Sequence, residues 1–211
     1  MSSISIIGLG NMARALADRA LAGGHAVEVI GRDPAKAKEF AAAFGGATVG
    51  TPGAAPAGDI VVLAMPYAGA TAVVSEYGAA LNGKVIIDIT NPVSPDLQGV
   101  VTPEGSSGAQ EIAKAAPAGA HVVKAFNTVF GHMLALGNPL DVLIAGDDVE
   151  AGAAEAKATV SAFIKSLGLR PLDTGPLGMA RWLEGTGVVM IGLGRHGAGS
   201  FDFTLGVNTS A

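Results

Sequence analysis

The chain has no cysteine and few aromatic side chains: one tryptophan, two tyrosines and seven phenylalanines in 211 residues. Without cysteine it forms no disulfide, no zinc–thiolate site and no thiol nucleophile, and it suits a reducing compartment. A chain of this length buries roughly 70% of its unfolded surface on folding. A hydrophobic core is therefore enough to stabilise it without covalent or metal cross-links.

Basic clusters and long apolar runs are also missing. Thirteen Lys and Arg residues stand against 18 Asp and Glu residues, for a net charge of −5, and no cationic cluster is dense enough to follow a nucleic-acid backbone. No run of about 18 uninterrupted apolar residues occurs, and the N-terminus enters an apolar strand directly. The four histidines are scattered, without metal-ligand spacing. We expect a cytoplasmic protein with no nucleic-acid, membrane or metal partner.

The chain does contain an alternation of strand and helix patterns over its first two thirds. Runs rich in Val and Ile, typical of buried parallel strands, occur at residues 3–7, 26–30, 47–50, 59–64, 84–89, 120–125 and 140–145. Helical patterns lie between them, at residues 11–22, 34–44, 69–81 and 109–116 and, as a helix or turn, at 129–136. This spacing predicts right-handed crossovers and an α/β fold: a Rossmann-type, doubly wound, mostly parallel sheet.

The last third has a different pattern. A helix is expected over residues 147–167, begun by acidic residues that suit its positive end, then an edge strand at 170–173 and a helix from Pro176 to Ile191. We expect these elements to form a C-terminal helical extension of about 146–211, packed on a core of about 1–145. The prediction is a single domain over residues 1–211.

Residues 8–13 read GLGNMA, a G-x-G-x-x-A motif directly after an expected strand and at the start of a helix. In a dinucleotide-binding turn, the first glycine allows the sharp bend and the second lets the backbone approach a pyrophosphate. The helix N-terminus then offers free N–H groups and partial positive charge to the phosphates. We therefore expect cofactor contacts at Gly8, Leu9, Gly10, Asn11 and Met12. The alternative is a tight turn with no ligand.

The end of the second expected strand distinguishes NADP from NAD. An NAD-binding domain carries Asp or Glu there, which accepts a hydrogen bond from the ribose 2′-hydroxyl. This chain has Gly31 at that position, followed by Arg32, and Lys36 lies one turn into the next helix. A guanidinium suits a phosphate dianion because it is planar, charged and bidentate, so we expect these three residues around the 2′-phosphate of NADP(H). The alternatives are ordinary surface charges, or Asp33 accepting from a ribose hydroxyl.

Two later turns are expected at the same edge, because open α/β sheets bind ligands at the carboxyl ends of their strands. Ala64, Met65 and Pro66 follow the fourth expected strand, with Tyr67 next, and Asn91 follows the fifth. Their backbone is placed to line the nicotinamide half of the cofactor. For Tyr67, simple packing is an equally good interpretation.

Several segments together resemble the F420-dependent NADP reductase family. They are GLGNMARALADRALAGGHAVEVIGRDPAKA (8–37), DITNP (88–92), VVKAFNTV (122–129), AGDD (145–148) and GLRPLDTGPLGMARWLE (168–184). The same pattern is similar to the NADPH-oxidoreductase domain of the six-transmembrane metalloreductases and, more distantly, to pyrroline-5-carboxylate reductases. The resemblance covers nearly the whole chain.

The resemblance implies hydride transfer between NADP(H) and a deazaflavin. It places NADP contacts at Leu9, Asn11, Met12, Arg32 and Lys36 and at the turns around Met65 and Asn91. It also places a flavin-type ring against the nicotinamide, near Ala125, Phe126 and Asn127, with ring alignment and water exclusion as the main catalytic contributions.

The chain departs from the archaeal deazaflavin reductases at two positions. It has Gly31 where they commonly have serine, and Asn127 in the stretch where they commonly have histidine. The second substrate therefore stays open between F420 and a flavin, FMN or FAD.

No catalytic side chain is evident. His132 is the one weak candidate for a proton donor, and Lys124 is either an active-site cation or a structural or solvated one. The alternative function is a non-catalytic NADPH-binding sensor or partner subunit; imine or ketone reduction lacks an evident proton donor. The apolar run at 188–191 packs on its own core or forms a homodimer face that completes the second-ligand pocket.

Overall fold

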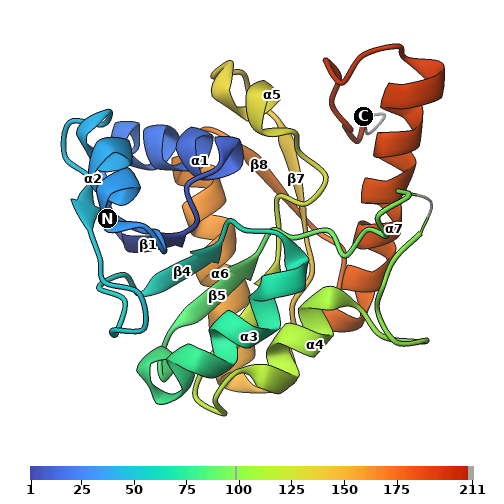
Figure 1. The fold of residues 1–211 in the computed structure, drawn as a ribbon. Coiled ribbons are helices and arrows are strands. Elements are labelled where there is room, and N and C mark those ends of the chain that lie inside the picture. The colour runs from blue at the N-terminus through green and yellow to red at the C-terminus, as the bar shows by residue number, and fades with distance from the viewer. Residues whose placement is uncertain (98, 209–211) are drawn as a thin grey trace.

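The computed structural model describes residues 1–97 and 99–208 of the chain (Figure 1). Six strands form one parallel sheet in the order β3-β2-β1-β4-β5-β6. The strands are β1 (Ser3–Ile7), β2 (Ala26–Ile30), β3 (Thr48–Val49), β4 (Ile60–Leu63), β5 (Val85–Asp88) and β6 (His121–Lys124). The strand order reverses direction beside β1, as in a doubly wound sheet. The predicted Rossmann-type fold is confirmed.

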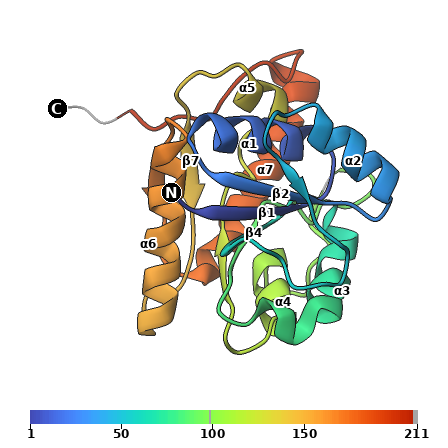
Figure 2. The ribbon, with the colours of Figure 1, turned by 90° about the vertical axis from the view of Figure 1, so that its left-hand side faces the viewer.

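Helices cover both faces of this sheet (Figures 1 and 2). The helices that follow its strands are α1 (Asn11–Ala22), α2 (Pro34–Ala42), α3 (Tyr67–Tyr77), α4 (Gly108–Ala115) and α5 (Gly131–Ala135), and α6 (Ala151–Ser166), which comes later in the chain, also packs on the sheet. Successive side chains of a strand point to opposite faces. In β4, Ile60 and Val62 accordingly pack with α1 and α6, and Val61 and Leu63 pack with α3 and α4.

The helix starts follow from local chemistry. Pro34 stands at the first position of α2, as expected, because its missing N–H is not needed there. The helix predicted from residue 147 begins only at Ala151. The acidic residues ahead of it make tertiary contacts instead: Asp147 accepts a hydrogen bond from the backbone N–H of Leu177, and Asp148 pairs with Lys157.

The last two strands form a sheet of their own. β7 (Asp141–Ile144) and β8 (Arg170–Asp173) pair in parallel, with α6 as the crossover between them. An isolated antiparallel bridge between Lys124 and Ala145 joins this pair to the main sheet. Pro171 has no N–H to donate, which suits the predicted edge strand. The strand predicted at residues 140–145 therefore belongs to this second sheet and not to the six-stranded one.

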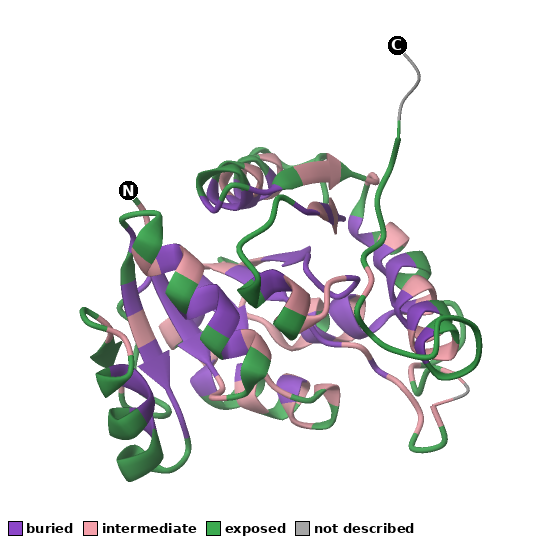
Figure 3. Ribbon diagram, turned by 90° about the horizontal axis from the view of Figure 1, so that it is seen from above, coloured by how far each residue is buried: buried purple, intermediate pink, exposed green. Residues whose placement is uncertain are grey.

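Helix α7 (Ala180–Gly192) closes the far end of the molecule, beside β6 and α4 (Figure 1). It follows a 3₁₀ turn at Leu177–Met179 and continues into a π-helical turn at Leu193–Gly197, close to the predicted helix from Pro176 to Ile191. Beyond it the chain returns across α5 to β7. Seen from above, buried residues run along the strands and the inner helix faces, and exposed residues lie outside (Figure 3).

Candidate functional site

The glycine-rich turn joins β1 to α1 and presses against the end of β4. Gly8 has φ +126°, and a Cβ built there would lie 1.9 Å from the carbonyl oxygen of Ala64. Its N–H donates to the carbonyl of Ile30 at 2.9 Å. At Gly10, in contrast, a Cβ would meet nothing within 4 Å. Gly8 is therefore required by packing, while Gly10 keeps one side of the turn open to a ligand.

The N-terminus of α1 faces this open side. Gly10 is its N-cap, and no side-chain cap hydrogen bond is present among the described residues. The N–H groups of the first turn and the positive end of the helix suit a phosphate. The geometry is the one predicted from the G-x-G-x-x-A motif.

The end of β2 carries the expected cations at the surface. Arg32 and Lys36 are both exposed. Asp33 is the N-cap of α2, and its Oδ1 accepts from the N–H groups of Ala35 at 2.9 Å and Lys36 at 3.2 Å. Capping occupies Oδ1 of Asp33, and Arg32 is the exposed cation at this strand end.

Gly31 has its own structural reason. It is buried, and a Cβ at this position would lie 2.4 Å from Cδ1 of Leu9. The side chain of Leu9 thus packs over the end of β2. The sequence predicts Gly31 at the 2′-phosphate, as a position without a carboxylate or hydroxyl, and does not predict its contact with Leu9.

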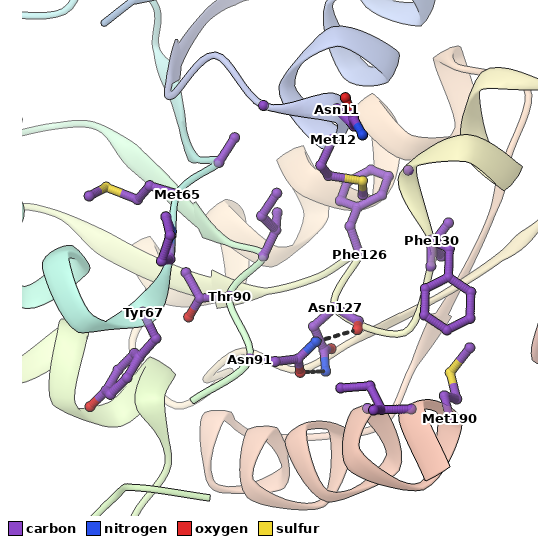
Figure 4. Close-up of a pocket in the computed structure, with 18 residues that line it drawn as sticks. Asn11, Met12, Met65, Tyr67, Thr90, Asn91, Phe126, Asn127, Phe130 and Met190 are labelled. Carbon is purple, nitrogen blue, oxygen red and sulfur yellow. Dashed lines mark hydrogen bonds between the residues drawn. The ribbon is translucent and has the colours of Figure 1, made fainter. Parts of the chain in front are cut away.

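A pocket of about 350 Å³ opens at the carboxyl ends of β1, β4, β5 and β6 (Figure 4). Of the predicted site residues, it brings together Gly10, Asn11, Met12, Ala64, Met65, Pro66, Asn91 and Asn127, with Tyr67 beside them. The others lie elsewhere: Gly8, Leu9, Gly31, Arg32 and Lys36 belong to the turn and the end of β2. Ala125 is fully buried in the main core and does not line the pocket.

Most of the remaining lining residues were missed by sequence reasoning. Phe126, near which the resemblance places the second ring, also lines the pocket; the missed residues are Ile89, Thr90, Val129, Phe130, Gly131, Gly187, Met190 and Ile191. The last three come from α7, so the 188–191 run is split: Met190 is buried at the pocket and Val189 is 61% exposed. Gly187 was the available signal, since a glycine inside a helix often marks a close approach. A Cβ there would lie 2.5 Å from Oδ1 of Asn91.

Two asparagines tie the ends of β5 and β6 to α7 (Figure 4). Asn91 donates from Nδ2 to the backbone oxygen of Asn127 at 2.9 Å. Asn127 donates from its Nδ2 to Oδ1 of Asn91 at 3.0 Å and to the carbonyl of Leu183 at 2.8 Å. These bonds hold one wall of the pocket in place across three segments distant in the chain.

The residue before Asn127 has an uncommon backbone. Phe126 has φ +61° and is 1% exposed. The left-handed region is costly for a bulky residue, and such residues persist where the surrounding structure enforces them, often at functional sites. Here the left-handed residue ends β6 and turns the chain into the pocket wall.

A buried ion cluster lies behind this wall. The ammonium group of Lys124 donates to Oδ2 of Asp88 at 2.8 Å, to Oε1 of Glu184 at 2.9 Å and to the backbone oxygen of Thr90 at 2.5 Å. All three charged side chains are at most 1% exposed. Lys124 is therefore a structural cation and lies outside the pocket lining.

Glu184 also connects α7 to α4. Its two carboxylate oxygens accept from the backbone N–H groups of Gly108 at 2.9 Å and Ala109 at 3.2 Å, at the start of α4. Charged hydrogen bonds of this kind offset part of the cost of burying the carboxylate. The cluster thus joins β5, β6, α4 and α7 behind the pocket.

His132 is held at the surface. Its Nε2 lies 3.0 Å from the backbone oxygen of Phe201 and 3.1 Å from Oδ1 of Asp202, and its ring stacks on Phe130. Phe130 lines the pocket, and His132 does not. The side chain proposed as a weak proton donor therefore contacts the C-terminal segment.

Tyr67 is the one titratable side chain among the described residues that line the pocket. Burial raises the pKa of its phenol above the ordinary value, and the carboxylates of Glu111, Glu184 and Asp88 raise it further. Its hydroxyl therefore stays protonated at neutral pH and is available as a hydrogen-bond donor.

The described ranges, 1–97 and 99–208, contain no group of three His, Asp or Glu side chains placed to hold a metal ion. No helix within them is long and apolar enough to cross a membrane.

Known proteins match the chain in sequence and in fold. Residues 3–92 match the family described as NADP oxidoreductase, coenzyme F420-dependent. The metalloreductase STEAP3 of Rattus norvegicus is 34% identical over 86% of the chain, and the F420-dependent NADP reductase of Methanocaldococcus jannaschii is 30% identical over 66% of it. The chain spans 35% of the first relative's length and 64% of the second's.

A solved structure from Arthrobacter sp. FB24, described as a candidate F420-dependent NADP reductase, has the same fold. The two superpose with a TM-score of 0.85 at 26% identity, over 99% of this chain and 100% of that one. On the sequence of residues 3–92 and the fold of the whole chain, this protein is related to the F420-dependent NADP oxidoreductase family.

Proposed function

We propose that the chain is an NADP(H)-dependent oxidoreductase that transfers hydride between NADP(H) and a deazaflavin such as F420, or a flavin such as FMN or FAD. The observation that carries the proposal is one continuous edge of the sheet. Along it lie the exposed Arg32, the open turn at Gly10 and the pocket at the ends of β5 and β6.

The dimensions of this edge suit a dinucleotide. β2 and β5 are separated by three interstrand spacings, or about 14 Å at roughly 4.8 Å each. A dinucleotide bound across the strand-order reversal lies over this span, with its pyrophosphate at the first helix. Arg32 and Lys36 would hold the 2′-phosphate, the first turn of α1 the pyrophosphate, and the pocket the nicotinamide.

The chain's own residues position the rings and exclude water. The bound cofactor supplies the hydride. The lining includes the apolar side chains of Met12, Met65, Val129, Phe130 and Met190, which suit the faces of planar rings. Holding two rings in a dry pocket at the right separation is a sufficient contribution for direct transfer, which requires no protein acid or base.

Titration of the purified chain with NADPH, NADH and 2′,5′-ADP tests the cofactor, and addition of F420, FMN or FAD then tests turnover. We expect NADPH and 2′,5′-ADP to bind, NADH to bind more weakly, and NADPH oxidation to follow addition of F420 or a flavin. Equal affinity for NADPH and NADH would contradict the proposed contact between Arg32 and the 2′-phosphate. NADPH binding without turnover on any of the three acceptors would contradict the hydride-transfer reaction.

The absence of side-chain acids and bases other than Tyr67 from the described pocket lining also favours a second candidate, a non-catalytic NADPH sensor or partner subunit. The same titration separates the two, because steady-state turnover by the purified chain excludes a purely sensory role.

We also propose a cytoplasmic homodimer formed through α7. Its outer face exposes Trp182, Val189 and Leu193, spaced seven and four residues apart along one side of the helix. Because other α7 residues line the pocket, a partner on this face would lie beside the second substrate. Light scattering should give twice the chain mass, and Val189→Asp should return it to the monomer value; a monomeric wild type contradicts the proposal.

A further inference from the structure

Two polar atoms in the pocket are buried and without a hydrogen-bond partner in the described structure: Oγ1 of Thr90 and Oδ1 of Asn127. The two residues are 3% and 6% exposed, and both line the pocket. Buried polar atoms are almost always paired, because an unmet hydrogen bond is costly. Because both residues line the same pocket, a polar ligand group bound there is the partner that the two atoms lack.

The chemical role of the Asn127 atom is determined by its neighbours. Its Nδ2 donates to the carbonyl oxygen of Leu183 and to Oδ1 of Asn91, and both of these atoms are acceptors. The amide nitrogen must therefore occupy that side of the side chain. The unpaired atom is the amide oxygen, which accepts and cannot donate.

The backbone groups of Thr90 are paired, and its side-chain hydroxyl is not. Its backbone N–H donates to Oδ1 of Asp88 at 2.8 Å, and its backbone oxygen accepts from Lys124. The buried ion cluster thus anchors both main-chain groups and leaves the hydroxyl as the polar group without a partner. A hydroxyl is able to donate to a ligand oxygen.

The two atoms belong to adjacent strand ends. β5 and β6 pair in parallel with Asp88 opposite Lys124, so Thr90 and Asn127 both lie just past the last paired residues. The left-handed Phe126 turns the chain there, and the Asn91–Asn127 hydrogen bonds hold the two ends together. One small ligand group can therefore meet an acceptor from one strand end and a donor from the other.

We propose that Asn127 and Thr90 recognise the primary carboxamide of the nicotinamide ring. Oδ1 of Asn127 accepts an N–H of the carboxamide, and the hydroxyl of Thr90 donates to its carbonyl oxygen. The assignment rests on the proposed NADP(H) function. Its consequence is orientational: the pair prevents the ring from rotating about its bond to ribose, and so determines which ring face meets the second substrate.

The test is a binding cycle with two ligands that differ in one group. NADP⁺ carries the carboxamide, and its 3-acetylpyridine analogue keeps the carbonyl oxygen and replaces the NH₂ group with a methyl. Dissociation constants are measured by calorimetry for the wild type and for Thr90→Val and Asn127→Leu, with 2′,5′-ADP as a ligand that lacks the ring. Melting temperatures confirm that each variant is folded.

The wild type should bind the analogue about tenfold more weakly than NADP⁺, the effect expected for leaving a buried acceptor unmet. Asn127→Leu should bring the ratio of the two dissociation constants close to one. Thr90→Val should weaken both ligands by the same factor, about three- to tenfold, and leave the ratio unchanged, because both keep the carbonyl oxygen. Thr90→Ser retains a hydroxyl and should bind both ligands like the wild type.

Thr186→Val is the matched control for Thr90→Val. It removes the hydroxyl of a threonine that bonds Trp182 and does not line the pocket, so the tenfold ratio should persist. If Asn127→Leu does not fold, the wild-type ratio alone still decides: equal affinity for the two ligands overturns the proposal. An unchanged ratio in folded Asn127→Leu, or wild-type affinity in Thr90→Val, also overturns it.

These outcomes are separate from failure of the proposed function. If neither NADP⁺ nor 2′,5′-ADP binds the wild type, the proposed function is wrong. If 2′,5′-ADP and NADP⁺ bind and the ratio is one, only the carboxamide assignment is wrong.

Discussion

The two ends of the ligand-binding edge are built in different ways. The turn end consists of residues 8–12 and 31–36, two short segments on adjacent strands, with backbone N–H groups and exposed cations as its functional groups. The pocket end consists of residues 89–91, 126–131 and α7, with buried polar groups held by a network across distant segments. Loss of an exposed functional group at the turn end should therefore change affinity alone, whereas loss of a buried polar group at the pocket end should change stability as well.

The largest effect is expected at the pocket end, in Lys124→Met. The substitution leaves the carboxylates of Asp88 and Glu184 buried without their cation, which typically costs about 3–5 kcal/mol of unfolding free energy. Urea denaturation measures the loss. Lys114→Met, at an exposed ion pair with Glu111, is the control and should leave the unfolding free energy nearly unchanged. A Lys124→Met variant as stable as the wild type would mean that the cluster does not stabilise the pocket wall.

A pair of glycine substitutions separates packing from ligand access at the turn end. Gly8→Ala forces a side chain into a positive φ and against the carbonyl of Ala64, and should cost about 2–4 kcal/mol of stability. Gly10→Ala has open space and an ordinary φ of −80°, so its stability should change by less than about 1 kcal/mol.

The second variant should nevertheless lose NADPH affinity, because the added methyl group occupies the open side of the turn. Thermal unfolding and NADPH titration of both variants make the comparison. If Gly10→Ala binds NADPH normally, the phosphates do not approach this turn.

Arg32→Ala tests charge recognition without a change in packing, since the side chain is exposed. Loss of a charged hydrogen bond worth roughly 1.5–3 kcal/mol should raise the NADPH dissociation constant by about tenfold or more. The NADH dissociation constant and the melting temperature should stay close to wild type. An equal loss of NADH affinity would show that Arg32 does not read the 2′-phosphate.

The smallest effect is expected for Gly31→Ser, which introduces the residue common in archaeal relatives. Its Cβ would lie 2.4 Å from Cδ1 of Leu9, the flexible end of a side chain, so we expect a loss of about 1 kcal/mol rather than unfolding. Adding Leu9→Ala should recover most of that loss if the contact is its cause. No recovery in the double variant would place the cause elsewhere.

The sequence predicted features that depend on neighbouring residues, and it did not predict features that depend on residues distant in the chain. The strands, the glycine turn and the start of α2 are local features, in which hydrophobic alternation, Gly8 and Pro34 act on their immediate neighbours. The start of α6 differs from the prediction because Asp147 binds Leu177, 30 residues away, and Asp148 pairs with Lys157 inside the helix rather than joining its first turn. Likewise, the role of Gly31 depends on Leu9, which lies on another strand end.

By itself, the sequence determined the Rossmann-type sheet, the position of its glycine-rich turn and the cationic strand end, because each follows from the backbone preferences and charges of a few consecutive residues. Only the tertiary structure decided that α7 forms a pocket wall, that Lys124 is a buried structural cation, and that Thr90 and Asn127, which line one pocket, each keep a buried polar atom without a partner in the described structure. Those features depend on which distant segments come into contact when the sheet and its helices pack. Local sequence patterns do not predict such contacts.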